Sequence, residues 1–324
     1  MLGGRPPRTR RSAALLAVVL VLSACGVDGS DAGPLRILVP NAVGGGYDTT
    51  ARVAAGAMES EGLSERPEVF NVEGGSGAVG LARLVGERGN PDLMMMMGLG
   101  VVGAVNSVEA AASLGEVTPV ARLLTEPEVV MVATASRHRD VRDLLRAWAD
   151  APGRFVVGGG SEKGGPDHLA AHQLGDAMGI DPRRVVYRTY DGGGPLLAAL
   201  FDGEVDFAVS GVLESLDQAR AGSVRVLAVT GAERVPGVAA PTLREAGIDL
   251  EFANWRGLVA PPGLSDAERQ RLVDLVTRMH DSDAWRDAER ANGWTDAFLT
   301  GDAFGSFLAA EDARVRELLG RPGE

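Results

Sequence analysis

Cysteine, lysine and aromatic side chains are scarce in this 324-residue chain. Cys25 is the only cysteine, so no disulfide can form within the chain. Aromatic residues make up 5% of the sequence, so the cores are expected to be built mainly from Val, Leu and Ala. The length fits two domains. Acidic residues outnumber basic ones by 44 to 32, and this balance argues against nucleic acid or an anionic membrane surface as a direct partner.

The N-terminus has the features of a signal peptide. Four arginines between residues 5 and 11 precede an apolar run from Ala13 to Leu22, which is too short to span a bilayer as a mature helix. Small residues then precede Cys25, as a lipoprotein signal peptidase requires. We therefore predict a lipoprotein signal peptide over 1–24 and a lipid on Cys25. The alternative is an ordinary signal peptide with an incidental cysteine.

Cleavage would leave an exported protein on a lipid anchor. Residues 25–33 are rich in Gly, Ser and Asp and are expected to form a flexible tether. Removing 1–24 takes away four arginines and no acids, so the mature charge becomes (32 − 4) − 44 = −16. The expected location is the outer face of the cytoplasmic membrane. The pair Arg10-Arg11 leaves the choice between Sec and twin-arginine export open.

The remainder alternates between strand-like and helix-like segments, which predicts an α/β fold with largely parallel sheets. The expected strands are 35–39, 67–72, 93–98, 119–124, 129–134, 154–158, 185–190, 205–210, 224–230 and 252–259. Near the C-terminus, Ser265 and Glu268 have the spacing of a capping box and predict the start of a helix. Two more helices are expected, around 283–291 and 302–319.

Glycine-rich loops follow six of the expected strands. They cover residues 44–48, 73–80, 97–103, 158–168, 190–195 and 210–214. In an open parallel sheet, the loops at the carboxyl ends of strands line the ligand crevice. Three of these loops lie before residue 105 and three after 155, a spacing that predicts two half-sites facing one another.

No catalytic motif is complete. The Gly44 loop fails the dinucleotide fingerprint at Thr49, the 158–168 loop lacks the Gly-Lys of a P-loop, and neither Ser76 nor Ser161 lies in a full nucleophile elbow. His168 and His172 have the i,i+4 spacing of metal ligands, but the Glu of the zinc motif is absent, and a structural or surface role is favoured. We expect no enzyme activity, no cofactor and no metal.

Anion capture is the chemistry that the loops favour. Helix N-termini offer unpaired amides and a partial positive charge, and glycines allow a carboxylate to approach them. Lys163, the only lysine, lies in one of these loops, although a solvated side chain is the simpler interpretation. Asp48 either caps the first helix or accepts a ligand ammonium or hydroxyl.

Nearly the whole chain from Leu35 to about Leu319 resembles the substrate-binding proteins of tripartite tricarboxylate transporters, the TctC or Bug family. The segments that carry this resemblance are Val39-Pro40, Gly44-Gly45 with Asp48 and Ala51-Arg52, Asn71 with Gly74 to Gly80, Thr118 to Ala121, His168-Leu169, Tyr190 with Gly192 and Pro195, Gly203 with Val205-Asp206, Val226 to Thr230, "PTLREAGI" at 241–248 and "WRGLVAPPG" at 255–263. The chain departs from the common pattern at Val43 and at Val72-Glu73, which leaves the ligand open.

The resemblance implies a bilobal, type II-like periplasmic-binding-protein fold that clamps a carboxylate, citrate-like or a dicarboxylate, and delivers it to a membrane permease. One lobe is expected to comprise 34–127 and 255–324, and the other 128–254; the protein is expected to be a monomer. A ligand-presenting component of a receptor kinase is the alternative function, and an exported enzyme is a third. The predicted ligand-binding residues are Gly44, Gly45, Gly46, Tyr47, Asp48, Gly75, Ser76, Gly98, Ser161, Gly164, Gly165, His168, Tyr190, Gly192, Gly193 and Ser210.

Overall fold

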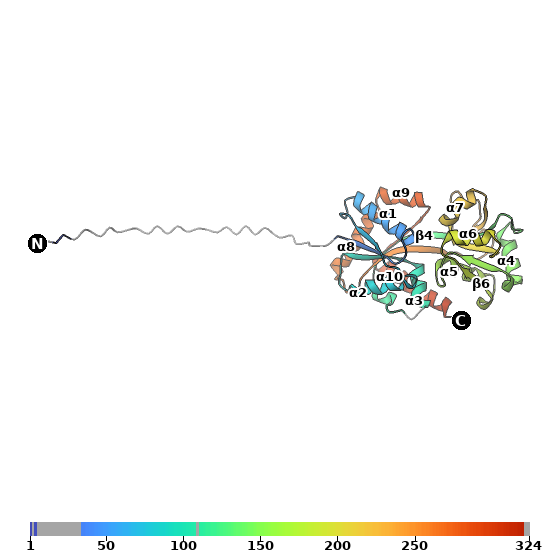
Figure 1. Ribbon diagram of the computed structural model, residues 1–324, viewed down its shortest axis with the longest axis horizontal. Coiled ribbons are helices and arrows are strands. Elements are labelled where there is room, and N and C mark those ends of the chain that lie inside the picture. The colour runs from blue at the N-terminus through green and yellow to red at the C-terminus, as the bar shows by residue number, and fades with distance from the viewer. Residues whose placement is uncertain (2, 5–33, 108–109, 321–324) are drawn as a thin grey trace. The chain divides into compact units, whose positions relative to one another are not determined.

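The computed structural model of the chain describes residues 1, 3–4, 34–107 and 110–320 (Figure 1). The side chains of residues 213 and 214 are also outside the description. The predicted signal peptide, apart from residues 1, 3 and 4, therefore lies outside the described residues. The same holds for the 25–33 tether and for the lipidation site at Cys25.

The described residues alternate between strands and helices, as the α/β prediction requires. The strands are β1 (Arg36–Val39), β2 (Glu68–Asn71), β3 (Leu93–Gly98), β4 (Thr118–Ala133), β5 (Val156–Gly159), β6 (Val186–Thr189), β7 (Phe207–Gly211), β8 (Val224–Val229), β9 (Ala253–Ala260) and β10 (Thr295–Thr300). The α-helices are α1 (Gly46–Ser60), α2 (Ala78–Gly86), α3 (Leu99–Ser107), α4 (Val141–Asp150), α5 (Pro166–Ala177), α6 (Gly193–Phe201), α7 (Val212–Arg220), α8 (Asp266–His280), α9 (Asp283–Asn292) and α10 (Gly301–Leu319).

These strands form one hydrogen-bonded sheet with the order β2-β1-β3-β9-β4-β7-β5-β6, and β8 and β10 also pair with β4. The pairs among β1, β2 and β3 and among β5, β6 and β7 are parallel. The strand pairs that β4 and β9 form are antiparallel. The expectation of largely parallel sheets therefore holds for the two ends of the strand order and is wrong for its centre.

Strand β4 connects the two parallel groups. It was expected as two strands, 119–124 and 129–134, but it runs without a break through Pro127. Its residues up to Pro127 pair with β9, and its residues from Glu128 onward pair with β7 and β8. Proline lacks an N–H, and β4 changes partners at this position, where the missing donor interrupts neither ladder.

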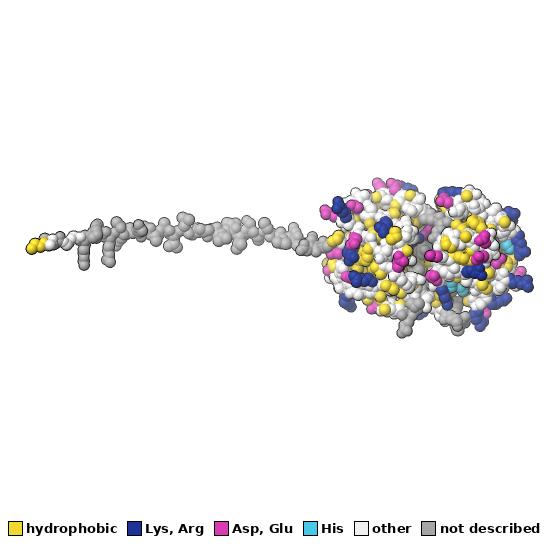
Figure 2. All heavy atoms as spheres, viewed as in Figure 1, with side chains coloured by type: hydrophobic (Ala, Val, Ile, Leu, Met, Phe, Trp, Pro, Cys, Tyr) yellow, Lys and Arg dark blue, Asp and Glu magenta, His cyan; other side chains and the backbone are white. Residues whose placement is uncertain are grey.

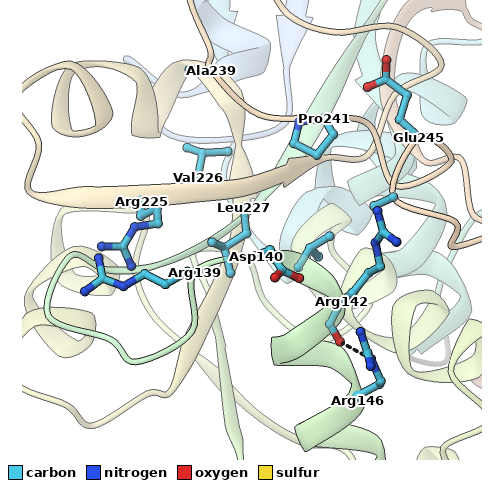
Figure 3. A pocket seen from close by; sticks show the side chains of 12 residues that line it. Arg139, Asp140, Arg142, Arg146, Arg225, Val226, Leu227, Ala239, Pro241 and Glu245 are labelled. Atoms are coloured by element: carbon cyan, nitrogen blue, oxygen red, sulfur yellow. Dashed lines mark hydrogen bonds between the residues drawn. The ribbon is translucent and has the colours of Figure 1, made fainter.

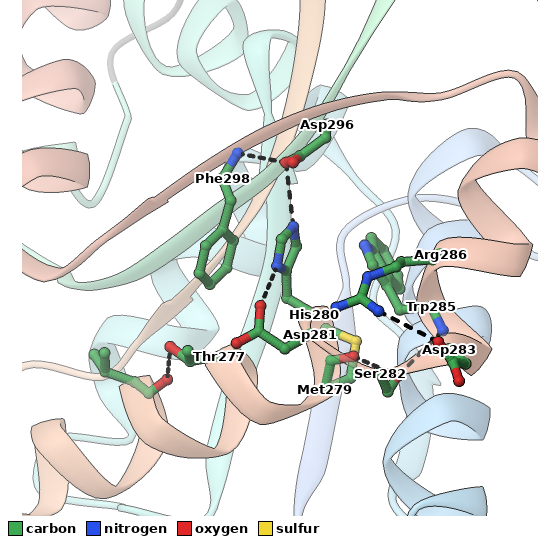
Figure 4. A network of polar contacts seen from close by, with 11 residues as sticks. Thr277, Met279, His280, Asp281, Ser282, Asp283, Trp285, Arg286, Asp296 and Phe298 are labelled. Carbon is green, nitrogen blue, oxygen red and sulfur yellow. Dashed lines mark hydrogen bonds and ion pairs between the residues drawn. The ribbon is translucent and has the colours of Figure 1, made fainter.

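The C-terminal helices lie where the sequence predicts them, and the capping box is present: Ser265 and Glu268 bond each other's main-chain amides. Strand β10 was not expected. It is tied to the end of α8 by His280, whose ring nitrogens lie 3.2 Å from Asp281 and 3.1 Å from Asp296 (Figure 4). The ring also stacks on Phe298 at 3.8 Å, so this histidine joins α8 to β10.

The surface of the described part is polar and mixed in sign. Figure 2 shows acidic and basic side chains interspersed over the face in view. Within the described ranges, no helix combines the length and apolar character needed to cross a bilayer.

Candidate ligand-binding site

A cavity of about 300 Å³ lies at the ends of β1, β5 and β7 and beside β4 and β9. Its wall is predominantly polar, and its volume suits a small metabolite. The lining residues are Asn41, Gly46, Tyr47, Ser76, Gly100, Glu126, Glu128, Gly160, Ser161, Glu162, Gly165, Pro166, Asp167, Tyr190, Asp191, Gly211, Asn254 and Arg256.

Helix α1 begins at this cavity, and no side chain caps its N-terminal amides by accepting a hydrogen bond from them. Its N-cap is Gly45, which carries no capping group, and the first main-chain bond of the helix runs from Thr49 to Gly45. The amides of Gly46 and Tyr47 consequently have no acceptor within the helix. Asp48, the acid of the first turn, is engaged behind them. It accepts hydrogen bonds from the Gly44 amide at 2.9 Å and from Arg52 and Asn71.

Helix α5, on the opposite strand group, follows a similar glycine loop but has fewer free amides: its first residue, Pro166, has no N–H, and the Asp167 amide donates to the Ser161 hydroxyl at 3.1 Å. Its N-cap Gly165 also has no capping side chain, and Gly164 has φ +86°, close to the +87° of Gly44. The Gly164 amide donates to Nδ1 of His168 at 3.2 Å, as the Gly44 amide donates to Asp48 four residues on. Two glycine loops of similar geometry thus border one cavity, and of the two helix starts that of α1 has the first-turn amides without a capping side chain.

The histidine of the second loop is neutral. Burial lowers the pKa of His168 to about 3, and the nearby His172 and Lys163 charges lower it further. A neutral ring can accept the Gly164 hydrogen bond, so His168 takes the structural place that Asp48 has in the first loop. Because its Nδ1 is occupied in this way, the His168–His172 pair is a poor metal site.

Arg256 supplies a buried cation beside α1. It is 8% exposed, and its Nη2 lies 2.5 Å from Glu126, itself 4% exposed. Its Nη1 donates to Thr50 at 3.1 Å, whereas Nε is buried and has no partner among the described residues. A Cβ added to Gly46 would lie 2.5 Å from Nη2, so the glycine lets the guanidinium reach the helix N-terminus.

Tyr47 packs behind this cation. Its hydroxyl accepts the Gly100 amide at 3.1 Å. Burial raises the pKa of Tyr47 to about 12, against the opposing effect of the Arg256 charge. The phenol is therefore protonated at neutral pH and has its own proton available to a cavity ligand or water.

Helix α3 closely approaches the second loop. A Cβ on Gly103 would lie 1.7 Å from the carbonyl oxygen of Gly164, and one on Gly164 would lie 2.6 Å from the Ser107 hydroxyl. Only a glycine at position 103 allows these main chains to touch. The contact joins a helix that follows β3 to the loop that precedes α5, on two sides of the cavity.

Six predicted site residues line the cavity: Gly46, Tyr47, Ser76, Ser161, Gly165 and Tyr190. The others are absent from its wall: Gly44, Gly45, Asp48, Gly75, Gly98, Gly164, His168, Gly192, Gly193 and Ser210. Several of these support the wall, as Gly44 and His168 do. Gly98 instead packs in β3, where a Cβ would lie 2.1 Å from the Trp255 carbonyl oxygen. Ligand contact by any of the sixteen remains a prediction.

Sequence reasoning missed four strand residues of the wall, Glu126, Glu128, Asn254 and Arg256, whereas Gly211 falls in the expected 210–214 loop without having been named as a site residue. Glu126 and Glu128 fall between the expected strands 119–124 and 129–134, and Asn254 and Arg256 fall in the expected strand 252–259, to which no site role was given. Charged residues inside otherwise apolar strands, as in "TEPEVV" and "NWRG", were the signal that could have identified them.

A second cavity, of about 450 Å³, lies between α4 and β8 and is rich in arginine (Figure 3). Two of its arginines donate to the main chain: Arg225 to the carbonyls of Thr134 and His138, and Arg146 to that of Arg142. Helix α4, which begins here, is capped by its own Asp140. This cavity therefore lacks the free helix amides of the first.

The carboxyl-terminal two thirds of the chain, residues 108–320, match the family described as "Tripartite tricarboxylate transporter family receptor" (TctC). A Pseudomonas sp. (strain P51) protein, "UPF0065 protein in tcbD-tcbE intergenic region", is 30% identical over 271 residues, which cover 81% of this chain and 79% of the relative. The chain belongs to the TctC family.

Solved structures agree with this assignment. A TctC solute-binding protein from Polaromonas is 26% identical, with a TM-score of 0.71 over 89% of this chain and 98% of that one. MatC from Rhodopseudomonas palustris, solved with bound malate, is 23% identical, with a TM-score of 0.73 over 88% and 98%. The predicted α/β periplasmic-binding fold is confirmed. The TctC family consists of extracytoplasmic receptors, so the expectation of a binding protein rather than an enzyme is also confirmed.

Proposed function

We propose that this TctC-family protein captures a small carboxylate in the 300 Å³ cavity and delivers it to the permease of a tripartite tricarboxylate transporter. The observation that carries the proposal is the uncapped N-terminus of α1, which opens on the cavity beside the buried guanidinium of Arg256. Helix amides bind anions because they are unpaired donors at the positive end of the helix dipole. Di- and tricarboxylates are the first class to test, since MatC holds malate.

Arg256 supports the same assignment. Its buried Nε is a donor in need of an acceptor, and it lies next to the first turn of α1. A ligand carboxylate bound between the Gly46 amide and this guanidinium would satisfy both donors. The predicted second contact, through the loops 161–165 and 190–194, would hold the other end of the ligand.

The arrangement in two lobes is part of the proposal. We assign 34–127 and 255–324 to one lobe and 128–254 to the other. The change of partner within β4 at Pro127 supports a crossing at that point, and β9 would provide the return. We also propose that the mature protein is a monomer anchored at the outer face of the cytoplasmic membrane through a lipid on Cys25.

Binding to the full chain tests this function. Isothermal titration with malate, succinate and citrate should give saturable binding to at least one acid. In Gly45→Val, affinity for that acid should fall at least about tenfold, because the branched side chain stands at the amides that the carboxylate approaches.

The fold should tolerate this variant. Gly45 has φ −72° and ψ 170°, which valine adopts readily, and the nearest atom to an added Cβ is the Ala42 carbonyl oxygen at 3.4 Å. The matched control is Gly56→Val, in the same helix, where an added Cβ meets nothing within 4 Å. Unchanged binding in a well-folded Gly45→Val protein would place the carboxylate elsewhere.

A further inference from the structure

The strand side of the cavity is rich in hydrogen-bond acceptors. Glu126 and Glu128 are two residues apart in β4 and so point to the same face of the sheet. Asn254 stands directly opposite Glu126 in the β4–β9 ladder, and Gly211 stands opposite Glu128 in the β4–β7 ladder. All four residues line the cavity. A Cβ added to Gly211 would lie 3.4 Å from Oε1 of Glu126 and 4.0 Å from Oε2 of Glu128, so the glycine keeps the space beside both carboxyl groups free of a side chain.

These acceptors are deeply buried. Glu126 is 4% exposed, Glu128 1% and Asn254 9%. The amide oxygen of Asn254 has no hydrogen-bond partner among the described residues. A buried acceptor is costly to leave without a donor, so the site is built to receive donors from what binds there.

The excess of carboxyl groups in the cavity wall favours a positively charged donor on the ligand. Five carboxyl groups line the cavity, those of Glu126, Glu128, Glu162, Asp167 and Asp191, against one guanidinium. Arg256 is paired with Glu126 at 2.5 Å, so the cation already has an acid partner. A ligand with three negative charges would face this excess of carboxyl groups at short range, where like charges repel strongly.

A metal ion is a weaker explanation for the acids. Among the described residues, the one group of three or more acids or histidines with ligand atoms within 4.8 Å of one another is His280, Glu289 and Asp296, and none of these three lines the cavity. No three of the described cavity carboxyl groups therefore lie within 4.8 Å of one another. An organic cation, which offers several N–H donors over a wider radius, fits their spacing better.

We infer that Glu126, Glu128 and Asn254 bind a protonated nitrogen of the ligand, and that this receptor takes a small amino-bearing carboxylate rather than a tricarboxylate. The inference rests on the proposed function, which supplies the carboxylate half of the site. The carboxylate lies at the N-terminus of α1, and the ammonium group lies against β4 and β9. Gly211 provides the room for it.

Matched ligand pairs test this assignment by titration calorimetry on the full chain. Glutamate and glutarate differ by one amino group, and 4-aminobutyrate and pentanoate are near-isosteres that differ by an ammonium in place of a methyl. The amino member of at least one pair should bind at least about tenfold more tightly than its partner, and more tightly than citrate.

Glu128→Gln should bring this ratio close to one. The amino ligand loses a charged partner, and the partner without the amine loses a repulsive charge. Asn254→Ala should lower the ratio as well and serves as the second variant if Glu128→Gln does not fold. The control is Glu59→Gln, the same chemical change at an exposed position near the C-terminal end of α1.

The outcomes separate the two proposals. If glutarate, pentanoate or citrate binds at least as tightly as the amino ligands, with or without Mg²⁺, the ammonium subsite is wrong and the carboxylate function stands. The subsite is also wrong if the ratio is unchanged in folded Glu128→Gln and Asn254→Ala. If no acid of either class binds, the proposed function fails and the subsite fails with it.

Discussion

At the scale of single residues, the site depends on one buried ion pair. Arg256 and Glu126 are both nine-tenths buried, and each would be a costly isolated charge. The pair holds the guanidinium against Gly46, where a larger residue at that position would displace it. This pair is therefore a structural support of the proposed anion site as well as part of the cavity wall.

Arg256→Gln should lower the free energy of unfolding by about 3 kcal/mol, because Glu126 is left buried without its partner. The double variant Arg256→Gln with Glu126→Gln should recover part of that loss, since no net charge remains buried. Urea unfolding of the parent, both single variants and the double variant measures the coupling. A double variant as unstable as the sum of the singles would show that the two side chains do not depend on each other.

At the scale of elements, the loop before α1 is held by Asp48. The carboxylate is 2% exposed and accepts bonds from Gly44, Arg52 and Asn71. The hydrogen bond from Arg52 is the main cause that lowers the pKa of Asp48 to about 2, against the opposing effect of burial. The ordinary value is 3.8, so the folded state binds this proton more weakly than the unfolded chain does.

The sign of the pH dependence follows from this depressed pKa. The stabilisation by Asp48 is complete above about pH 4 and is lost as the pH falls towards 2. Asp48→Asn should lower stability at pH 7 by roughly 2 kcal/mol and should flatten the acid limb of the stability profile. Unfolding midpoints in urea from pH 2.5 to 7 measure both effects. An acid limb as steep in the variant as in the parent would contradict the assignment.

The contact between α3 and the loop before α5 can be tested by a substitution at Gly103. In Gly103→Ala the added methyl group would lie 1.7 Å from the Gly164 carbonyl oxygen, so α3 and the loop before α5 must separate. Ligand affinity should fall at least about tenfold if this contact forms part of the ligand-bound arrangement. Alanine stabilises helices relative to glycine by roughly 0.5–1 kcal/mol, so a weakened helix cannot explain the loss. Gly56→Ala in α1 is the control, and equal loss in both variants would contradict the prediction.

Some elements could be predicted from the sequence and others could not. The starts of α1 and α5 were predictable because glycine runs follow recognisable apolar strands. Arg256 and Glu128 were not assigned to a site, because within a strand a side chain's surroundings depend on which strands lie beside it. Those neighbours are set by long-range pairing, such as β4 with β9, and local pattern carries little information about them. Strand β10 was not predicted for the same reason, since its pairing with β4 joins segments far apart in the chain.

At the scale of the whole molecule, Cys25 should determine where the protein resides. Each buried methylene of an acyl chain contributes about 0.8 kcal/mol to membrane binding, so several chains anchor firmly. Cys25→Ser should leave ligand affinity unchanged and move the protein from the membrane fraction to the soluble or secreted fraction. Fractionation and immunoblotting measure this. A variant that remains with the membrane would show that another feature anchors the protein.

The two proposed lobes predict a change of shape on binding. If they close about β4 and β9, a saturating ligand should decrease the radius of gyration measured by small-angle X-ray scattering. The Arg256→Gln variant, with a weakened anion site, should need more ligand for the same decrease. An identical scattering curve with and without a ligand that calorimetry shows to be bound would argue against closure.

Lys163, the only lysine of the chain, provides a single side-chain amine for chemical labelling. Lys163 is exposed and lies between Glu162, a residue of the cavity wall, and Gly164, which touches α3. An amine-reactive fluorophore therefore has one side chain to modify, and it sits beside the cavity. Labelled at this position, the unmutated protein should act as an optical reporter whose emission changes as ligand enters, so that unlabelled acids can be ranked by competition.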